Sequence, residues 1–301
     1  MVPLLLATLC SASIALIFKR SEAAGLNRYA VTSANYLAAS AVSLITLAAG
    51  GWPRASEVAS RASWAEIGSL LAGSGATPSP AASLTWGVLV GMSAGAVFFL
   101  AFIYYQVSVR RHGVGLSGTF AKLGILVPML GSLALWREWP QGPQWAGMGL
   151  AAVAILLVHW PARGGAPRAA LLLLFLLGGA AEFSNKVFQK YAAVDHKSVF
   201  LFVTFTVALA LSLVATWRKR RPVTVRDGLT GLAVGVPNLF SSFFLILALD
   251  HLPAAVVFPA YGAGSIVIIN LAGAALFGER LSRREWCAIA LTVIALVLIS
   301  T

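Results

Sequence analysis

The 301-residue chain contains few charged residues, and few of those are acidic. Charged residues make up 11% of the sequence, with ten aspartates and glutamates against 22 lysines and arginines. Soluble domains carry about 25% charged residues, so this composition excludes an ordinary soluble protein. The 59% of hydrophobic residues and the mean hydropathy of +0.85 instead predict a protein embedded in a lipid bilayer.

Enzyme motifs and metal-ligand spacings are also missing from the sequence. Cys10 and Cys287, its two cysteines, form neither a disulfide framework nor a metal-ligand pattern. The sequence contains no metalloprotease motif and no serine-hydrolase motif. It also contains no P-loop, because the glycine-rich segment 73–78 lacks the lysine of that motif. The net charge of +12 comes from short basic clusters between apolar runs, unlike the continuous basic face of a nucleic-acid-binding protein. We therefore expect no enzyme activity, no metal, no cofactor and no nucleic-acid partner.

Ten apolar segments are long enough to cross a bilayer. A transmembrane helix needs about 20 mostly apolar residues. The predicted spans are 2–18, 28–50, 84–107, 114–135, 143–161, 168–189, 197–217, 227–249, 254–277 and 284–301. The first run lacks a basic stretch before it and a small-residue cleavage site after it, so we assign it as a span and not as a cleaved signal peptide. In the long connection 51–83, the stretch 56–71 fits either a short interfacial helix or a solvated loop.

Basic residues are divided unevenly between the two sides of this predicted bundle. Fifteen of the 22 lysines and arginines fall in odd-numbered connections and five in even-numbered ones, while Lys122 and Lys186 lie within spans. Cytoplasmic loops of membrane proteins carry the excess of lysine and arginine. We therefore predict a multi-pass protein of the cytoplasmic (inner) membrane, with odd-numbered connections inside and both termini outside.

Two parts of the chain are similar when residue n is compared with residue n+141. Glu138 then matches Glu279 and Trp145 matches Trp286, each at the same distance after a span. This register pairs the third to fifth spans with the eighth to tenth. The sequence therefore predicts an internal duplication.

An odd number of helices per repeat makes the second copy enter the membrane from the opposite face. The expected fold class is an all-α membrane protein with ten transmembrane helices, built as two inverted five-helix repeats. The repeats are 1–161, which includes the loop 51–83, and 162–301. Such repeats permit alternating access, in which a midplane site opens to each side in turn. A duplication that merely enlarged the bundle is the alternative.

Two motifs in the second half are typical of one transporter family. Ala-Leu-Asp-His-Leu-Pro-Ala-Ala at 248–255 leads into the ninth span, and Phe-Gly-Glu-Arg-Leu-Ser at 277–282 precedes Trp286. The first half has Trp-Arg-Glu-Trp-Pro at 136–140 in place of the second motif. The chain thus resembles the drug/metabolite transporter superfamily, in its ten-helix EamA branch. The resemblance implies a secondary carrier driven by a proton or exchange gradient, and it leaves the cargo open.

Lys122 lies in the middle of the fourth predicted span, where neither water nor an adjacent carboxylate is expected. A lysine at the centre of a membrane helix costs about 2.5 to 3.5 kcal/mol, so such residues face a bundle interior or a wet cavity. We interpret Lys122 as a residue that contacts an anionic group of the substrate or compensates the charge of Glu182. A structural ion pair between helices is the alternative.

The sixth predicted span carries a polar stripe. Glu182, Asn185, Lys186 and Gln189 recur at helical spacing and share one face. A carboxyl group inside a membrane is a candidate for proton coupling or substrate contact. Alternatively, Lys186 simply neutralises Glu182 one turn away. The stripe could line a central cavity, or only the mouth of that cavity on the non-cytoplasmic side.

Uncharged polar side chains are expected near the middle of other spans. Asn35 and Tyr36 belong to the second span, Asn238 to the eighth, and Tyr261 and Asn270 to the ninth. They are candidates for substrate binding or coupling, although intramembrane asparagines also bridge helices without binding anything.

We predict a secondary active transporter that works by alternating access. Its expected partners are the lipid bilayer and a small polar or amphipathic organic metabolite, such as an amino acid, a sugar or an organic anion. Transport would be coupled to protons or to a counter-substrate, in a monomer or homodimer. The rival functions are a channel, a membrane-embedded enzyme that does not transport, and a scaffold. The absence of charged filter rings and catalytic motifs argues against the first two, and a scaffold leaves a buried Lys122 unexplained.

Overall fold

The computed structural model describes residues 1–50, 61–73, 77–112, 121, 123–159, 169–219, 221–277 and 283–300. Its helices are α1 (Val2–Ala23), α2 (Arg28–Gly50), α3 (Arg61–Leu71), α4 (Pro80–His112), α6 (Leu126–Trp136), α7 (Gly142–His159), α8 (Ala169–Tyr191), α9 (Lys197–Lys219), α10 (Val225–His251), α11 (Ala254–Phe277) and α12 (Arg283–Ser300), with one 3-10 turn, η2 (Val194–His196). Within these ranges there is no strand. The prediction of a helical protein is confirmed.

Six of the described helices are long and apolar enough to cross a membrane. They are α2, α4, α8, α9, α10 and α11, and shorter apolar helices occur at Val2–Phe18, Leu126–Trp136 and Trp286–Ala295. The ends of α2 and α11 coincide with the predicted spans 28–50 and 254–277. The chain is therefore a multi-pass membrane protein.

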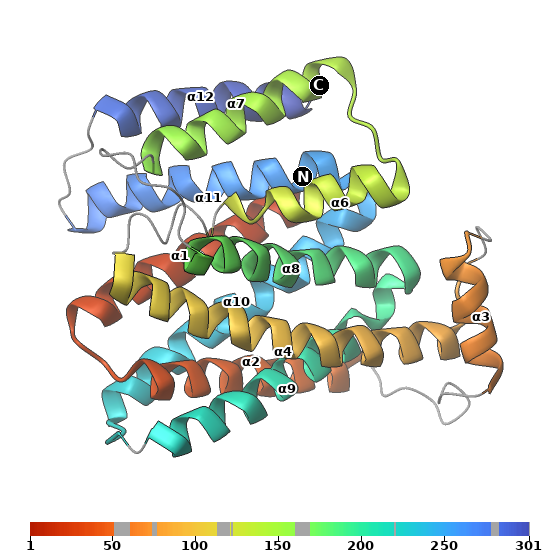
Figure 1. Cartoon of the computed structure of the whole chain (residues 1–301), viewed down its shortest axis with the longest axis horizontal. Helices are drawn as coiled ribbons and strands as arrows, with labels where there is room; N and C mark the ends of the chain where they lie inside the picture. Colours follow the sequence, from red (N-terminus) through yellow and green to blue (C-terminus); the bar gives the residue numbers. More distant parts are fainter. Residues whose placement is uncertain are drawn as a thin grey trace.

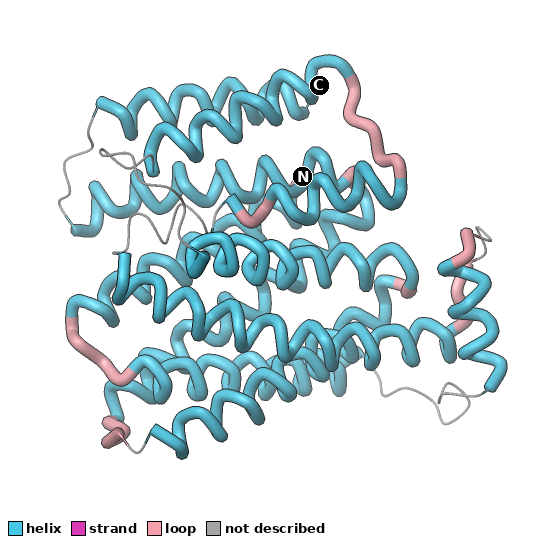
Figure 2. The backbone as a smooth tube through the Cα atoms, in the orientation of Figure 1, coloured by secondary structure: helices cyan, strands magenta, loops and turns pink. Residues whose placement is uncertain are grey.

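The helices lie side by side, and their connections gather at two ends of the bundle (Figures 1 and 2). One end, which we call the α3 end, carries α3 and the segments 137–141, 192–196 and 252–253. The opposite end carries the segments 24–27 and 221–224. These are the two groups of even-numbered and odd-numbered connections expected from the sequence.

Helices of the first half of the chain pack mainly on helices of the second half. α1 packs on α10 and α11, and α8 packs on α4 and α6. α2 contacts α9 and α10, α4 contacts α9, and α7 contacts α12. The centre of the bundle is therefore formed jointly by the two halves.

Small residues allow two of these crossings to be very close. A Cβ atom at Gly235 of α10 would overlap the backbone of Asn35 in α2. Likewise, a Cβ atom at Gly95 of α4 would lie 2.5 Å from the carbonyl oxygen of Thr204 in α9. Small residues let membrane helices approach until their backbones touch, so these glycines determine how α2 and α9 sit against their neighbours.

The predicted span 114–135 is interrupted in the structure. Helix α6 begins at Leu126, after a turn at 124–125. Gly124 lies against the backbone of α8, where an added Cβ would be 2.9 Å from the Gly179 nitrogen. The Gly124 carbonyl accepts from the N–H of Val127 at 2.9 Å, because Pro128, four residues further on, has no N–H to donate, and this interrupts the helix. Residues 113–120 and Lys122 lie outside the described residues.

The connection between α2 and α4 contains the helix α3, which covers residues 61–71 of the predicted stretch 56–71, while residues 56–60 lie outside the described residues. Ile67 and Leu70 are buried, and Trp64 is exposed. The Glu66 carboxylate accepts hydrogen bonds from the backbone N–H and the hydroxyl of Ser79, both at 2.6 Å. These bonds lower the pKa of Glu66 and attach α3 to the start of α4.

Candidate functional site

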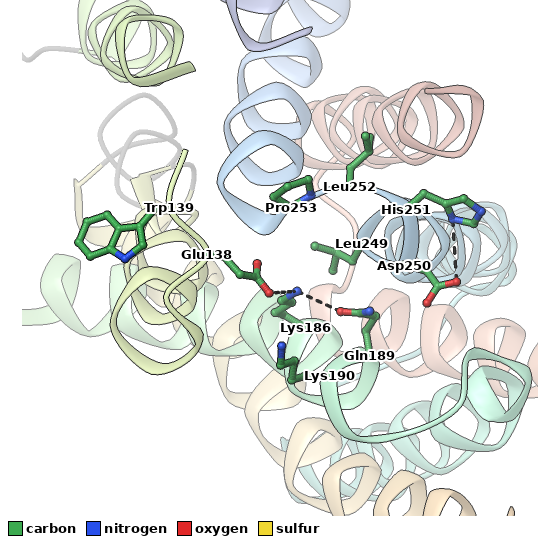
Figure 3. Close-up of a pocket in the computed structure, with 10 residues that line it drawn as sticks. All are labelled: Glu138, Trp139, Lys186, Gln189, Lys190, Leu249, Asp250, His251, Leu252 and Pro253. Atoms are coloured by element: carbon green, nitrogen blue, oxygen red, sulfur yellow. Dashed lines mark hydrogen bonds and ion pairs between the residues drawn. The ribbon is translucent and has the colours of Figure 1, made fainter. Parts of the chain in front are cut away.

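A pocket of about 360 Å³ opens at the α3 end, between α6, α8 and the junction of α10 with α11 (Figure 3). It combines charged and apolar side chains. The lining residues are Glu138, Trp139, Lys186, Gln189, Lys190, Leu249, Asp250, His251, Leu252 and Pro253. Its size suits a small organic solute.

Glu138 reaches this pocket because of how α6 ends. Arg137 adopts a left-handed conformation with φ 54°, and the N–H groups of Arg137 and Glu138 donate to the carbonyls of Leu133 and Ser132. The bond from Arg137 to Leu133 is that of the αL motif, in which glycine is the usual residue at the left-handed position. The chain thereby turns sharply and directs Glu138 towards α8.

Glu138 and Lys186 form a largely buried ion pair. The Lys186 Nζ lies 2.7 Å from Glu138 Oε1, and the two side chains are 4% and 17% exposed. Lys186 Nζ also donates to Gln189 Oε1 at 3.0 Å. The second carboxylate oxygen of Glu138 accepts from the backbone N–H of Ala254, the first residue of α11, at 3.2 Å. One carboxylate therefore joins α6, α8 and α11.

Two lysines lie over one aromatic ring at this site. Lys186 Nζ lies 5.7 Å and Lys190 Nζ 5.9 Å from the centre of the Trp136 ring. The ring Nε1 donates to the hydroxyl of Tyr191 at 2.9 Å, which holds the indole in place. Because the negative face of an aromatic ring attracts cations, Trp136 keeps both ammonium groups close to the pocket.

The predicted polar stripe on α8 is thus divided. Lys186 and Gln189 line the pocket, whereas Glu182 and Asn185 lie deeper. At about 1.5 Å of rise per residue, Lys186 lies about 7 Å and Glu182 about 13 Å from the end of α8 at Tyr191. The ammonium group of Lys186 pairs with Glu138 of the segment after α6, so its partner in the structure lies on another element and not only on its own helix.

Glu182 belongs to a second polar group inside the bundle. Its Oε1 lies 3.5 Å from the hydroxyl of Tyr261 in α11, which is 2.8 Å from the hydroxyl of Ser241 in α10. Asn185 donates its Nδ2 to Glu182 Oε2 at 3.4 Å, and its buried Oδ1 has no partner among the described residues. The structure therefore brings together three predicted site residues, Glu182, Asn185 and Tyr261.

Asn35 and Asn238 lie further towards the opposite end. Asn238 Nδ2 donates to Asn35 Oδ1 at 3.1 Å, and this bond joins α10 to α2. The Nδ2 of Asn35 is buried without a partner among the described residues. Asn238 lies one helical turn from Ser241, so the polar groups continue from α11 across α10 to α2.

Tyr36, by contrast, belongs to the packed core. Its hydroxyl donates to the carbonyl of Phe98 at 3.1 Å, and its ring contacts those of Phe102 and Phe205. This environment explains the residue as a structural one, so its predicted role in binding is not supported by the geometry. Lys122 and the side chain of Asn270 lie outside the described residues.

The second half of the chain can now be compared with known proteins. Residues 169–301 match the EamA-like transporter family. These residues form an EamA-like transporter domain. The matched range begins at α8 and includes α12, so it contains Glu182, Lys186, Asn238 and Tyr261. The resemblance predicted from the motifs at 248–255 and 277–282 is confirmed for this part of the chain, in line with the drug/metabolite transporter superfamily.

Two further proteins are similar to this chain. An uncharacterised protein of Haemophilus influenzae is 24% identical over 203 residues, which cover 65% of this chain and 69% of that protein. A crystal structure of another protein aligns with a TM-score of 0.70 at 16% identity, over 99% of this chain and 94% of the other. The second similarity concerns the fold alone, and it extends through both halves.

The ion pair at the pocket joins the EamA-like domain to the first half of the chain. Lys186 belongs to the domain and Glu138 to the segment before it. Glu138 is not among the predicted site residues because it directly follows a predicted span, in a position typical of a loop residue. Its match with Glu279 in the n+141 register was the available signal.

Proposed function

We propose that this protein is a secondary active transporter that moves a small polar or amphipathic organic solute across the cytoplasmic membrane by alternating access. The observation that carries the proposal is a track of polar side chains from the pocket into the bundle. It runs from Lys186 through Glu182, Tyr261 and Asn238 to Asn35, on four helices. Polar groups at this depth are unfavourable in lipid and mark solute or ion pathways.

The packing of the helices supports two inverted five-helix repeats at 1–161 and 162–301. In the proposed repeats α1 corresponds to α8, α4 to α10, and α6 to α11. Each contact then has a counterpart: α1 packs on α10 and α11, just as α8 packs on α4 and α6. Two halves that can exchange their conformations provide a route to alternating access.

The distribution of basic residues supports an orientation with the α3 end outside the cell. Arg28, Arg218, Lys219, Arg221 and Arg226 lie at or near the opposite end. Because positive residues favour the cytoplasmic side, the pocket at Glu138 would open outwards and both termini would also lie outside.

Glu182 is the residue that we assign to coupling. A carboxylate held by hydroxyl and amide groups can bind a proton or a solute cation in turn. Its neighbour Asn185 lies on α8, like Glu182 itself, whereas Tyr261 lies on α11, so a change at Glu182 would be transmitted to α11. Lys122, on the fourth span, is proposed as the anion-binding partner of this site.

The test is exchange in liposomes that contain the purified protein. A thermal-shift screen of amino acids, sugars and organic acids first selects a solute that stabilises the folded state. We expect trans-stimulated exchange of that solute, chemically unchanged, and a loss of exchange in Glu182→Gln and Lys122→Ala. Ser93→Ala, an exposed hydroxyl on α4, is the control. Full activity in both site variants would remove the proposed site, and a modified product would favour an enzyme.

A further inference from the structure

The Glu138 carboxylate holds three helix ends together at the pocket. One oxygen pairs with Lys186 of α8 and the other accepts from the N–H of Ala254, where α11 begins. Glu138 itself follows the end of α6. Movement of α11 away from α6 or α8 therefore has to break at least one of these two contacts.

Burial makes the ion pair difficult to separate without a replacement. The Lys186 side chain is 4% exposed, so its ammonium group cannot exchange Glu138 for bulk water unless the site opens. A buried charge that loses its partner is strongly unfavourable. Gln189 accepts a hydrogen bond from Lys186 at 3.0 Å, but its neutral side chain does not balance the charge of the ammonium group. An incoming anion would balance that charge.

The pocket lies directly beside this pair and has room for such an anion. Lys186 and Lys190 both line it, and both lie near the Trp136 ring. Leu249 and Pro253 supply apolar walls, as Figure 3 shows around the ion pair. A carboxylate group with a small organic body would place its charge on Lys186 and its carbon atoms against these walls.

We propose that Glu138 and Lys186 form a charge latch that keeps the α3 end of the pathway closed, and that a carboxylate group of the solute opens it by replacing Glu138 on Lys186. This inference rests on the proposed transport function. The replacement keeps Lys186 neutralised and lets Glu138 move into water. Ala254 then loses its acceptor, and the start of α11 is released from the end of α6.

The closed state of the latch is tested with a single reporter cysteine. Leu249 lines the pocket and is 3% exposed, so Leu249→Cys, in a background with Cys10→Ser and Cys287→Ser, reports on opening. The full-length protein in liposomes is treated with a thiol reagent that does not cross membranes. We expect Glu138→Gln to speed labelling by about tenfold, because the closed state loses its pair and the open state gains population.

Two further variants make this result specific. Lys186→Met removes the same pair from the other side and leaves the bond between Ala254 and Glu138, so it should also speed labelling if it is the pair that closes the site. Glu66→Gln changes a carboxylate at the same end that bonds to Ser79 and not to the pocket, and labelling should stay unchanged. Equal labelling of the parent, Glu138→Gln and Lys186→Met would overturn the latch.

The chemistry of the opening group is tested with matched probes. Propionate and glycine carry a carboxylate, whereas propionamide and glycinamide have an amide in its place. We expect propionate and glycine to speed labelling of the parent protein. None of the four compounds should change the labelling of Glu138→Gln, which is already fast. Sodium chloride at the same ionic strength is the control. Equal effects of a carboxylate and its amide, or no effect of either carboxylate, would refute the role of the anion.

The labelling experiment and the transport assay can fail independently. Fast labelling in Glu138→Gln without exchange of any solute would leave the latch in place and refute the transporter. Exchange of a solute together with unchanged labelling would keep the transporter and refute the latch.

Discussion

Lys186 pairs with Glu138 at 2.7 Å although Glu182 precedes it by one turn on the same helix. The pair across helices is possible because the left-handed Arg137 turns the chain towards α8 at the end of α6. Glu182 is directed towards Tyr261 and Asn185. This choice of partner separates the charges at the pocket from the polar group deeper in the bundle.

The ion pair should contribute to folding stability as a unit. We expect Lys186→Met to destabilise the purified protein by about 3 to 5 kcal/mol, because it leaves Glu138 without its cation. In Glu138→Gln with Lys186→Met, the loss should be smaller than the sum of the single losses by about 1 kcal/mol or more. Thermal unfolding in detergent measures these differences. Additive losses would show that the two residues do not interact.

The α2–α10 crossing can be tested with two glycines of one helix. Gly235→Ala should destabilise the protein, since the new Cβ would overlap the Asn35 backbone, whereas a Cβ added at Gly228 would meet nothing within 4 Å. Gly228→Ala should therefore be neutral or stabilising, by up to about 1 kcal/mol from helix propensity. The comparison uses thermal unfolding, and equal effects at the two positions would contradict the close crossing.

Tyr261 and Tyr36 allow a buried functional hydroxyl to be distinguished from a structural one. Tyr261→Phe removes the partner of Ser241 and Glu182, and we expect solute exchange to fall strongly. Tyr36→Phe removes the bond to the Phe98 carbonyl and should lower stability by about 1 kcal/mol while exchange is retained. If Tyr36→Phe lost solute exchange at a normal protein yield, Tyr36 would have to be counted among the residues of the binding site.

The attachment of α3 should depend on pH through Glu66. Its pKa lies below the usual value of 4.5 because the hydroxyl and N–H of Ser79 donate to the carboxylate. A group with a lowered folded-state pKa stabilises the folded state above its unfolded-state pKa, and this contribution is lost as the pH falls through the lower value. The protection of the α3 amides against hydrogen exchange, corrected for the intrinsic pH dependence of exchange, should thus be high at neutral pH and fall in acid. Glu66→Gln should abolish most of this pH dependence, and an unchanged pH profile in the variant would contradict the assignment.

The long apolar runs of the sequence indicated which segments are helices. Spans such as 197–217 and 227–249 differ from α9 and α10 by at most two residues at either end, because a bilayer requires long apolar helices whatever they pack against. The break before α6 lies four residues before Pro128, a helix-breaking residue that is visible in the sequence. Only the tertiary structure shows that the chain crosses α8 closely at this point, where Gly124 meets the α8 backbone.

The polar residues of the site were also visible in the sequence, since charged and amide groups in apolar runs are conspicuous. The side chains with which they pair could not be read from the sequence. Helical spacing favoured Glu182 as the partner of Lys186, because a sequence shows which residues share a helix face. Only the tertiary structure places Glu138 within 2.7 Å of Lys186 and moves Tyr36 into the aromatic core. Helix formation is local, whereas ion pairing depends on which helix ends meet.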